Sequence, residues 1–309
     1  MSKNIHLWLA PVLAALAGFI TLQMGQTSAI ALTLGTTVWV GYWWITEAVP
    51  IPFTSLLPFI LLPGLGVIDF KQASSAFGNH VIILLMGAFL LAKGLEASQV
   101  HKRIAFNIIN FIGGTSAFRI VFAFMCASAV LSMWISNTAT VLALLPVAVA
   151  IASASDNKKF AIALLLGLAY SASVGGVGTL IGTPPNVIFA SVYDNFAGEE
   201  YGFVRWMQIG VPIVLVTIPV VAFWLTRGIK LNSQIKLPAM GRWSVSEKRA
   251  LLVFSCIALL WVFRKNPLGG WAELTGVKLA GDATIALLGA LLMAVVPGDN
   301  NKPLLTWDN

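Results

Sequence analysis

Long apolar runs alternate with short polar or Pro- and Gly-rich breaks along almost the whole chain. A helix needs about 20 apolar residues to cross the hydrocarbon core of a bilayer, so the shorter runs must extend into their flanks. The pattern predicts an all-α polytopic membrane protein. Its spans are expected at Leu7–Gln23, Ile30–Val49, Ile51–Leu62, Val81–Leu95, Ala161–Ile181, Gly210–Thr226, Ala250–Phe263 and Ala283–Val296. The third of these contains several prolines and is expected to be kinked and irregular.

Two further apolar arms, Phe118–Ile135 and Ala139–Ala154, are joined only by Ser136, Asn137 and Thr138. They form either two full spans or one re-entrant helical hairpin. The hairpin is favoured, because a polar turn of three residues is too short for a loop at the headgroups. Irregular backbone at membrane depth is tolerated only where it lines a cavity or is buried in protein.

Composition agrees with a membrane protein: 58% of the 309 residues are hydrophobic and only 10% are charged, against about 25% charged in a soluble domain. This excludes disorder, a basic nucleic-acid-binding domain and a typical cytosolic enzyme. We expect no enzymatic activity, since paired intramembrane acids, an HExxH motif and a Ser/His arrangement are lacking. The three dispersed histidines do not predict a metal cluster. Leu7–Ile20 has the look of a signal peptide, but the equally apolar remainder favours an uncleaved first span.

Charge predicts the topology. With the N-terminus in the cytoplasm and the hairpin counted as an even crossing, 14 Lys and Arg residues lie inside and 5 outside, as the positive-inside rule requires. Six of the 14 fall in Arg227–Arg249, which is expected to be a cytoplasmic linker with a short amphipathic helix. Gln99–Asn110 is expected to be an interfacial helix.

The turn between the two arms carries the first candidate chemistry. Ser132 and Ser136 are four residues apart and share a helix face. Asn137 and Thr138 stand at the start of a new helix, whose free N–H groups and positive dipole end can hold an anion. The carbonyls that end the preceding arm suit a cation. Read alone, the turn is equally consistent with ordinary helix caps.

The second motif, Gly175–Asn186, places four glycines and two consecutive prolines inside an expected span. Proline clashes with a continuing helix and lacks an N–H, so we expect a helix broken near the membrane midplane, the strongest sequence pointer to a transporter ion site. Freed carbonyls, the hydroxyls of Thr179 and Thr183 and the amide of Asn186 could form an oxygen cage for Na⁺. Glycine-mediated helix packing explains the glycines but not the break.

The runs WISNTATVLALLP (Trp134–Pro146) and SASVGGVGTLIGTPPN (Ser171–Asn186) together closely resemble the divalent anion/sodium symporter family of dicarboxylate and citrate transporters. The resemblance implies two inverted repeats, each with a re-entrant hairpin and a broken helix, and homodimers that work by an elevator movement. It also implies a sodium site and a site for a substrate carboxylate. The sodium site would use Ser132, Ser136, Asn137, Gly182, Thr183 and Pro184, and the carboxylate would bind Ser136, Asn137 and Thr138.

The resemblance also divides the chain into parts. The first repeat would cover residues 1–226, with scaffold spans at about 7–112, the hairpin at about 118–154, the broken helix at about 159–193 and a span at about 206–226. The linker would follow at 227–249, and 250–309 would hold the first two spans of an incomplete second repeat. Since a single Ser-Asn-Thr occurs, we expect a fragment or truncated chain that lacks half of the substrate site.

The function expected from these features is Na⁺-coupled symport of C4-dicarboxylates such as succinate, malate or fumarate, in the inner membrane of a bacterium. The ligands are then Na⁺ as coupling ion and a small dicarboxylate, with the lipid bilayer and a second copy of the chain as partners and no nucleic acid. Two alternatives stay open: exchange of dicarboxylates or other divalent anions, and a truncated fragment that dimerises without transporting.

Overall fold

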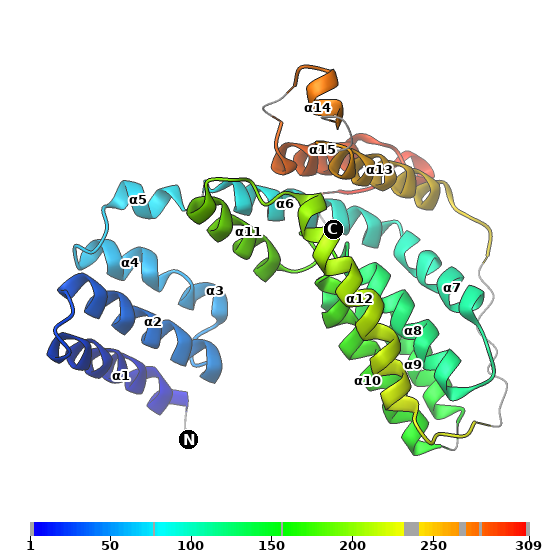
Figure 1. Cartoon of the computed structure of the whole chain (residues 1–309), viewed down its shortest axis with the longest axis horizontal. Coiled ribbons are helices and arrows are strands. Elements are labelled where there is room, and N and C mark those ends of the chain that lie inside the picture. The colour runs from blue at the N-terminus through cyan, green and yellow to red at the C-terminus, as the bar shows by residue number, and fades with distance from the viewer. Residues whose placement is uncertain are drawn as a thin grey trace. The chain divides into compact units, whose positions relative to one another are not determined.

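The computed structural model describes residues 3–76, 78–155, 157–231, 241–265, 270–277 and 280–306, and these contain helices but no strand (Figure 1). The expected all-α fold is confirmed. Four helical stretches of the described residues, α1, α10 and α12 among them, are long and apolar enough to cross a membrane. The chain divides into two compact units, residues 1–79 and 80–309.

The first unit is built on a close helix pair. Gly18 lies against the backbone of Ala31, and Gly35 against the carbonyl of Ala14, so small residues let the two backbones approach. The irregular third span is confirmed, since its prolines divide it into two short helices. The helices of this unit are α1 (Lys3–Gln23), α2 (Ser28–Thr46), α3 (Ile51–Thr54), α4 (Leu57–Gly64) and α5 (Phe70–Ser75).

The second unit holds both sequence motifs. Its helices are α6 (His80–Ala97), α7 (Val100–Ile112), α8 (Ala117–Ser132), α9 (Asn137–Ser153), α10 (Lys158–Gly176), α11 (Pro184–Ala197), α12 (Phe203–Thr226), α13 (Val245–Val262), α14 (Gly270–Leu274) and α15 (Asp282–Val295), followed by the short 3₁₀ helix Asp299–Asn301. The sequence did not predict α14. Residues 232–240, in the expected linker with its short amphipathic helix, lie outside the described residues.

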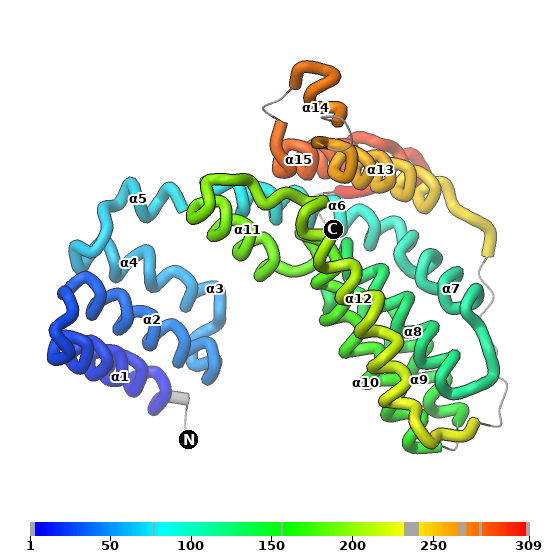
Figure 2. The backbone as a smooth tube through the Cα atoms, viewed as in Figure 1, coloured from blue at the N-terminus to red at the C-terminus, as the bar shows by residue number. Residues whose placement is uncertain are grey.

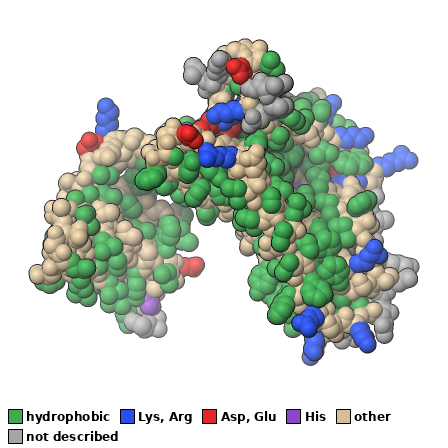
Figure 3. Space-filling view, in the orientation of Figure 1, with side chains coloured by type: hydrophobic (Ala, Val, Ile, Leu, Met, Phe, Trp, Pro, Cys, Tyr) green, Lys and Arg blue, Asp and Glu red, His purple; other side chains and the backbone are tan. Residues whose placement is uncertain are grey.

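Helices α8, α9, α10 and α12 lie lengthwise beside one another (Figure 2). Glycines on α10 again permit the closest contacts, because a side chain on Gly175 would overlap the backbone of Ala129 on α8. Figure 3 shows hydrophobic side chains along the flank of this bundle and Lys and Arg side chains gathered at one end. This is the distribution expected of helices that lie in lipid with their basic ends in water.

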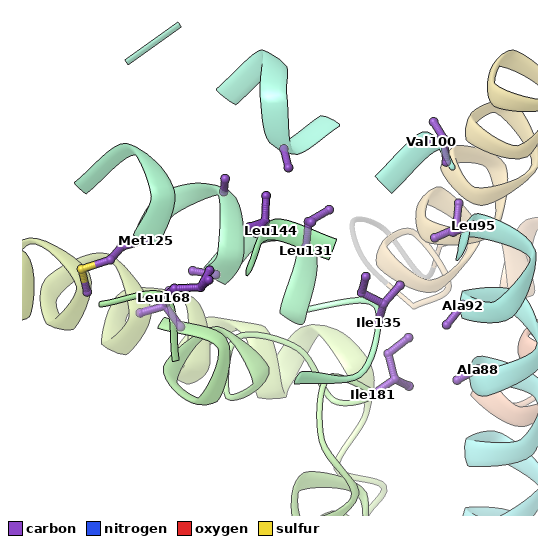
Figure 4. Packing of buried hydrophobic residues seen from close by; sticks show 14 of the residues in the cluster. Ala88, Ala92, Leu95, Val100, Met125, Leu131, Ile135, Leu144, Leu168 and Ile181 are labelled. Atoms are coloured by element: carbon purple, nitrogen blue, oxygen red, sulfur yellow. The ribbon is translucent and has the colours of Figure 1, made fainter. Parts of the chain in front are cut away.

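A second group consists of α6, α13 and α15. Gly87 of α6 packs against the backbone of Ala286 on α15, and Gly289 of α15 packs against Leu91 and Ile257. The buried side chains form one continuous cluster that also includes the hairpin arms (Figure 4). The two candidate motifs are therefore held in a packed protein interior.

Helix α7 is amphipathic, as expected, but its Arg103 side chain is buried. The Arg103 guanidinium pairs with Glu247 Oε1 at 2.8 Å and donates to the carbonyls of Gly241 and Arg242 at 2.7 and 3.0 Å. It also lies 4.9 Å from the ring centre of Trp243. Arg103 thus fixes the start of α13 to α7, a role that polar spacing along the helix does not reveal.

Charged side chains also meet where the loop between α11 and α12 contacts the loop after α13. Glu200 pairs with Arg264 and, at 2.5 Å, with Lys265 Nζ, and Arg264 Nε lies 2.8 Å from Asp282 Oδ1. Burial alone would raise the pKa of Glu200, but hydrogen bonds and positive charge from Lys265 and Arg264 hold it below its usual value. The carboxylate therefore stays ionised and paired at neutral pH.

The lowered pKa of Glu200 predicts how stability depends on pH. An unfolded Glu has a pKa of about 4.3. The stabilisation from ionised Glu200 is therefore fully present above that pH, and it is lost as the pH falls through the lower pKa of the folded state. We expect Glu200→Gln to reduce the melting temperature in detergent by a constant amount between pH 6 and 8. The difference from wild type should shrink below pH 4.

The neighbouring Glu199 is exposed, and its Oε2 lies 3.5 Å from Arg205 Nη1. Glu199→Gln is therefore the matched control, and it should lower the melting temperature less, because exposed ion pairs contribute little. A Glu200→Gln deficit that grows as pH is lowered would contradict the pairing.

Candidate functional site

The hairpin turn begins where α8 ends at Ser132. Ser136 is the N-cap of α9, with its hydroxyl accepting a hydrogen bond from the backbone N–H of Ala139 at 3.2 Å. Asn137 and Thr138 are the first two residues of α9, and within the described residues their backbone N–H groups donate no hydrogen bond. Ser136 and Thr138 are exposed, whereas Ser132 is fully buried. The turn therefore has an open side with free N–H groups and a buried side with a hydroxyl.

The second motif interrupts a helix. Helix α10 ends at Gly176 and α11 begins at Pro184, with the loop 177–183 between them. Asn186 is buried, and its Nδ2 donates to the carbonyls of Gly176 and Thr179, both at 2.8 Å. Pro184 and Pro185 have no N–H to offer, so the first turn of α11 cannot donate to the carbonyl oxygens that the break frees. The chemistry of the break suits a cation.

Two residues of the expected oxygen cage also hold the break together. The hydroxyl of Thr179 donates to the carbonyl of Met133, and the Asn186 amide is engaged as a donor. These two side chains hold the break together through their hydrogens, which leaves the lone pairs of Thr179 Oγ1 and Asn186 Oδ1 for a cation. Thr183 is the N-cap of α11, and its side chain makes no capping hydrogen bond.

The turn and the break lie against each other. The bond from Thr179 to Met133 joins them directly, and a side chain placed on Gly176 would meet Asn137 Oδ1. Ile135 of the turn and Ile181 of the loop are both buried, near Ala88 and Ala92 of α6 in Figure 4. The two motifs, separated by more than 30 residues in the sequence, therefore form one structural unit.

Oxygen atoms converge where the two motifs meet. Ser132 Oγ lies 2.5 Å from Asn137 Oδ1 and 2.6 Å from the carbonyl oxygen of Ala172. A hydroxyl carries one hydrogen, so it can donate to only one of these two acceptors. The carbonyl of Gly182 accepts no hydrogen bond within the described part of the chain. The single Ser132 hydrogen serves either Asn137 Oδ1 or the Ala172 carbonyl, and a bound cation would satisfy the other oxygen together with the Gly182 carbonyl.

The absent side chain of Gly176 leaves space in this cluster. The position of a Cβ there would lie 3.0 Å from Asn137 Oδ1 and 3.4 Å from the Gly182 carbonyl oxygen. Gly182 in turn contacts the backbone of Gly176, so any side chain at either position would close the space. The neutral, oxygen-only donors fit a hard cation such as Na⁺.

The structure thus brings together four of the predicted residues: Ser132, Asn137, Gly182 and Thr183. Ser136 and Thr138 lie on the exposed side of the same turn, and Pro184 is exposed at the start of α11. Sequence reasoning missed Ala172 and included Gly176 only as a glycine of the second motif; both residues contribute backbone only. The GG pair at Gly175–Gly176 was the available signal, because each glycine marks a close backbone approach.

These features define a class: a polytopic helical protein whose paired helical hairpin and broken helix are typical of secondary transporters. Comparison with known proteins specifies the family. The sequence model of the citrate transporter family matches residues 42–306. The chain therefore belongs to this family of multi-pass membrane proteins, and the expected membership among the divalent anion/sodium symporters is confirmed.

Two relatives bear the name sodium-dependent dicarboxylate transporter SdcS. The protein of Staphylococcus saprophyticus is 35% identical over 99% of this chain and 64% of its own length. The protein of Staphylococcus aureus is 36% identical over 89% of this chain and 57% of its own length. The chain thus spans about three fifths of the length of these relatives. Both names describe transporters, in agreement with the expectation that the chain is not an enzyme.

The role of Asn186 predicts a strong effect on folding. Asn186→Leu keeps the side-chain volume but leaves the buried carbonyls of Gly176 and Thr179 without a donor. We expect the free energy of unfolding in detergent to fall by about 2–6 kcal/mol, because each of the two unsatisfied carbonyls costs about 1–3 kcal/mol.

The exposed Asn195 on the same helix supplies the control, because Asn195→Leu makes the same chemical change without breaking a hydrogen bond of the described structure. Equal stability of the two variants would show that Asn186 does not hold the break.

Proposed function

We propose that the chain forms part of a Na⁺-coupled secondary transporter that carries C4-dicarboxylates such as succinate, malate or fumarate into a bacterial cell. The observation that supports this most strongly is the oxygen cluster formed by Ser132, Asn137, Ala172 and Gly182 where the hairpin turn meets the broken helix. Such a site binds a cation without any formal negative charge, so binding responds to the size and coordination preference of the ion.

The substrate carboxylate is proposed to bind at the open side of the turn. There the free N–H groups of Asn137 and Thr138, at the positive end of the α9 dipole, are accompanied by the exposed hydroxyls of Ser136 and Thr138. Na⁺ on the buried side of Asn137 would add positive charge next to the same residue. This shared residue supplies the physical basis of coupling, because each ligand favours the arrangement that the other needs.

The dicarboxylate class comes from the names of the relatives, and the family description adds citrate as a neighbouring possibility. We further propose that the hairpin is re-entrant, that the N-terminus is cytoplasmic, and that the protein works as a homodimer by an elevator movement in the inner membrane. The three-residue turn supports the re-entrant hairpin, and the charge distribution along the sequence supports the cytoplasmic N-terminus.

Transport is tested with proteoliposomes. An inward Na⁺ gradient should drive uptake of labelled succinate, and replacement of Na⁺ by K⁺ or choline should abolish it. Unlabelled malate and citrate then serve as competitors to define the substrate. Succinate uptake that is indifferent to Na⁺ but stimulated by internal dicarboxylate would favour exchange instead. Because the chain covers about three fifths of its relatives, the 309 residues are assayed beside the full gene product.

Ser132 offers a sharper test of the sodium site. Ser132→Ala removes a buried oxygen from the cluster, so Na⁺ should bind at least about tenfold more weakly, as expected for a lost contact to a charge. The measurement is the Na⁺ concentration that gives half of the Na⁺-dependent rise in melting temperature.

Ser128 provides a matched control one helical turn earlier. Its hydroxyl is equally buried and also donates to an α10 carbonyl, that of Leu168, at 3.2 Å, but it lies outside the oxygen cluster. Ser128→Ala should lower the melting temperature without changing the Na⁺ dependence. If both variants shift the Na⁺ dependence alike, Ser132 is not a ligand.

A further inference from the structure

The carbonyl of Val177, the first beyond the end of α10, is held by a residue that neither sequence motif contains. The indole Nε1–H of Trp206, in the second turn of α12, donates to Val177 O at 2.7 Å. Of the carbonyls freed by the break, those of Gly176 and Thr179 are held by Asn186 and this one by α12. A carbonyl at membrane depth needs such a donor, because water is not there to replace it.

Gly210, one turn further along α12, brings the helix backbone to the same point. A Cβ on Gly210 would overlap the Val177 carbonyl oxygen and would lie 3.2 Å from both the Gly178 oxygen and Trp206 Nε1. The α12 backbone therefore rests directly on the loop between α10 and α11. Only glycine at this position allows the indole to reach Val177 with the helix so close.

The ring of Trp206 also contacts the other half of the broken helix. It lies 5.7 Å from the ring of Phe189 on α11 and 6.1 Å from that of Tyr201, both edge to face. Tyr201 packs on Tyr193 of α11 at 4.9 Å, and Arg205 stacks over both tyrosines. Trp206 thus binds the end of α10 through its N–H and the body of α11 through its ring.

We propose that Trp206 is a positioning residue for the Na⁺ site, a role that rests on the function proposed above. It fixes the two half-helices relative to each other and so keeps the Gly182 carbonyl beside Asn137, with Gly176 and Gly182 in contact. Without the indole N–H, the Val177 carbonyl turns to other donors and the loop 177–183 shifts. The effect falls first on Na⁺, because Gly182 belongs to this loop, whereas the free N–H groups of α9 belong to the hairpin.

Trp206→Phe tests this role, since it removes the N–H and keeps an aromatic ring in the cluster. The control is Trp224→Phe on the same helix, where Trp224 is 71% exposed. We expect the Na⁺ concentration for half-maximal thermal stabilisation to rise about fivefold in Trp206→Phe, as for the loss of one hydrogen bond, and to stay unchanged in Trp224→Phe. At saturating Na⁺, the succinate concentration for half-maximal uptake should equal that of the wild type.

Gly210→Ala provides a second variant that acts on the same contact by pushing α12 away from Val177. It should also raise the Na⁺ concentration for half-maximal thermal stabilisation. In the double variant the free-energy effects of the two changes should be less than additive, because both act on the same contact with Val177. A Trp206→Phe protein that melts earlier without Na⁺ but keeps the wild-type Na⁺ requirement would reduce Trp206 to a packing residue and overturn the inference. A wild-type protein without any Na⁺ response would instead reject the proposed function, and this role with it.

Discussion

A single constraint organises the second unit: backbone carbonyls freed inside a membrane protein must find donors from within the protein. The break after Gly176 frees several at once, and two prolines remove the N–H groups that a new helix would offer. Asn186 bonds the two sides of the break to each other, and Thr179 bonds the break to the hairpin turn. Trp206 bonds it to α12. The Gly182 carbonyl is among those left over, and it borders the same space beside Gly176 as Asn137 Oδ1. The proposed cation site lies where the hydrogen-bond network leaves oxygens unsatisfied.

Glycines make this network geometrically possible. Gly175 admits the backbone of α8, Gly176 and Gly182 touch each other, and Gly210 admits the Val177 carbonyl. Helices in lipid associate by close packing rather than by a hydrophobic force, so small residues mark where backbones meet. At this site the same contacts do more than pack helices, since they decide which oxygens converge. A methyl group at either Gly176 or Gly182 would occupy the space proposed for Na⁺.

The sequence predicted those features of the fold and the candidate site that depend on residues close together in the chain. The spans, the hairpin turn and the break followed from hydrophobic length and from the prolines after Thr183, since these act within a few residues. The identity of the oxygen donors followed only in part. Ala172 contributes a main-chain carbonyl, which no side-chain pattern reveals, and Thr179 and Asn186 turned out to be donors to the backbone. The burial of Arg103 against Glu247 and the contact of Trp206 with Val177 join distant segments, and a single sequence has no signal for such pairs.

The proposed cation site is tested most directly by maps of the protein determined by electron cryomicroscopy in NaCl and in choline chloride. Density should lie between Asn137 Oδ1, Ser132 Oγ and the Gly182 carbonyl oxygen in NaCl only, and it should be absent from Ser132→Ala at the same Na⁺ concentration. Maps that are identical in both salts at this position, from protein that still shows Na⁺-dependent uptake, would place the coupling ion elsewhere and contradict the proposed site.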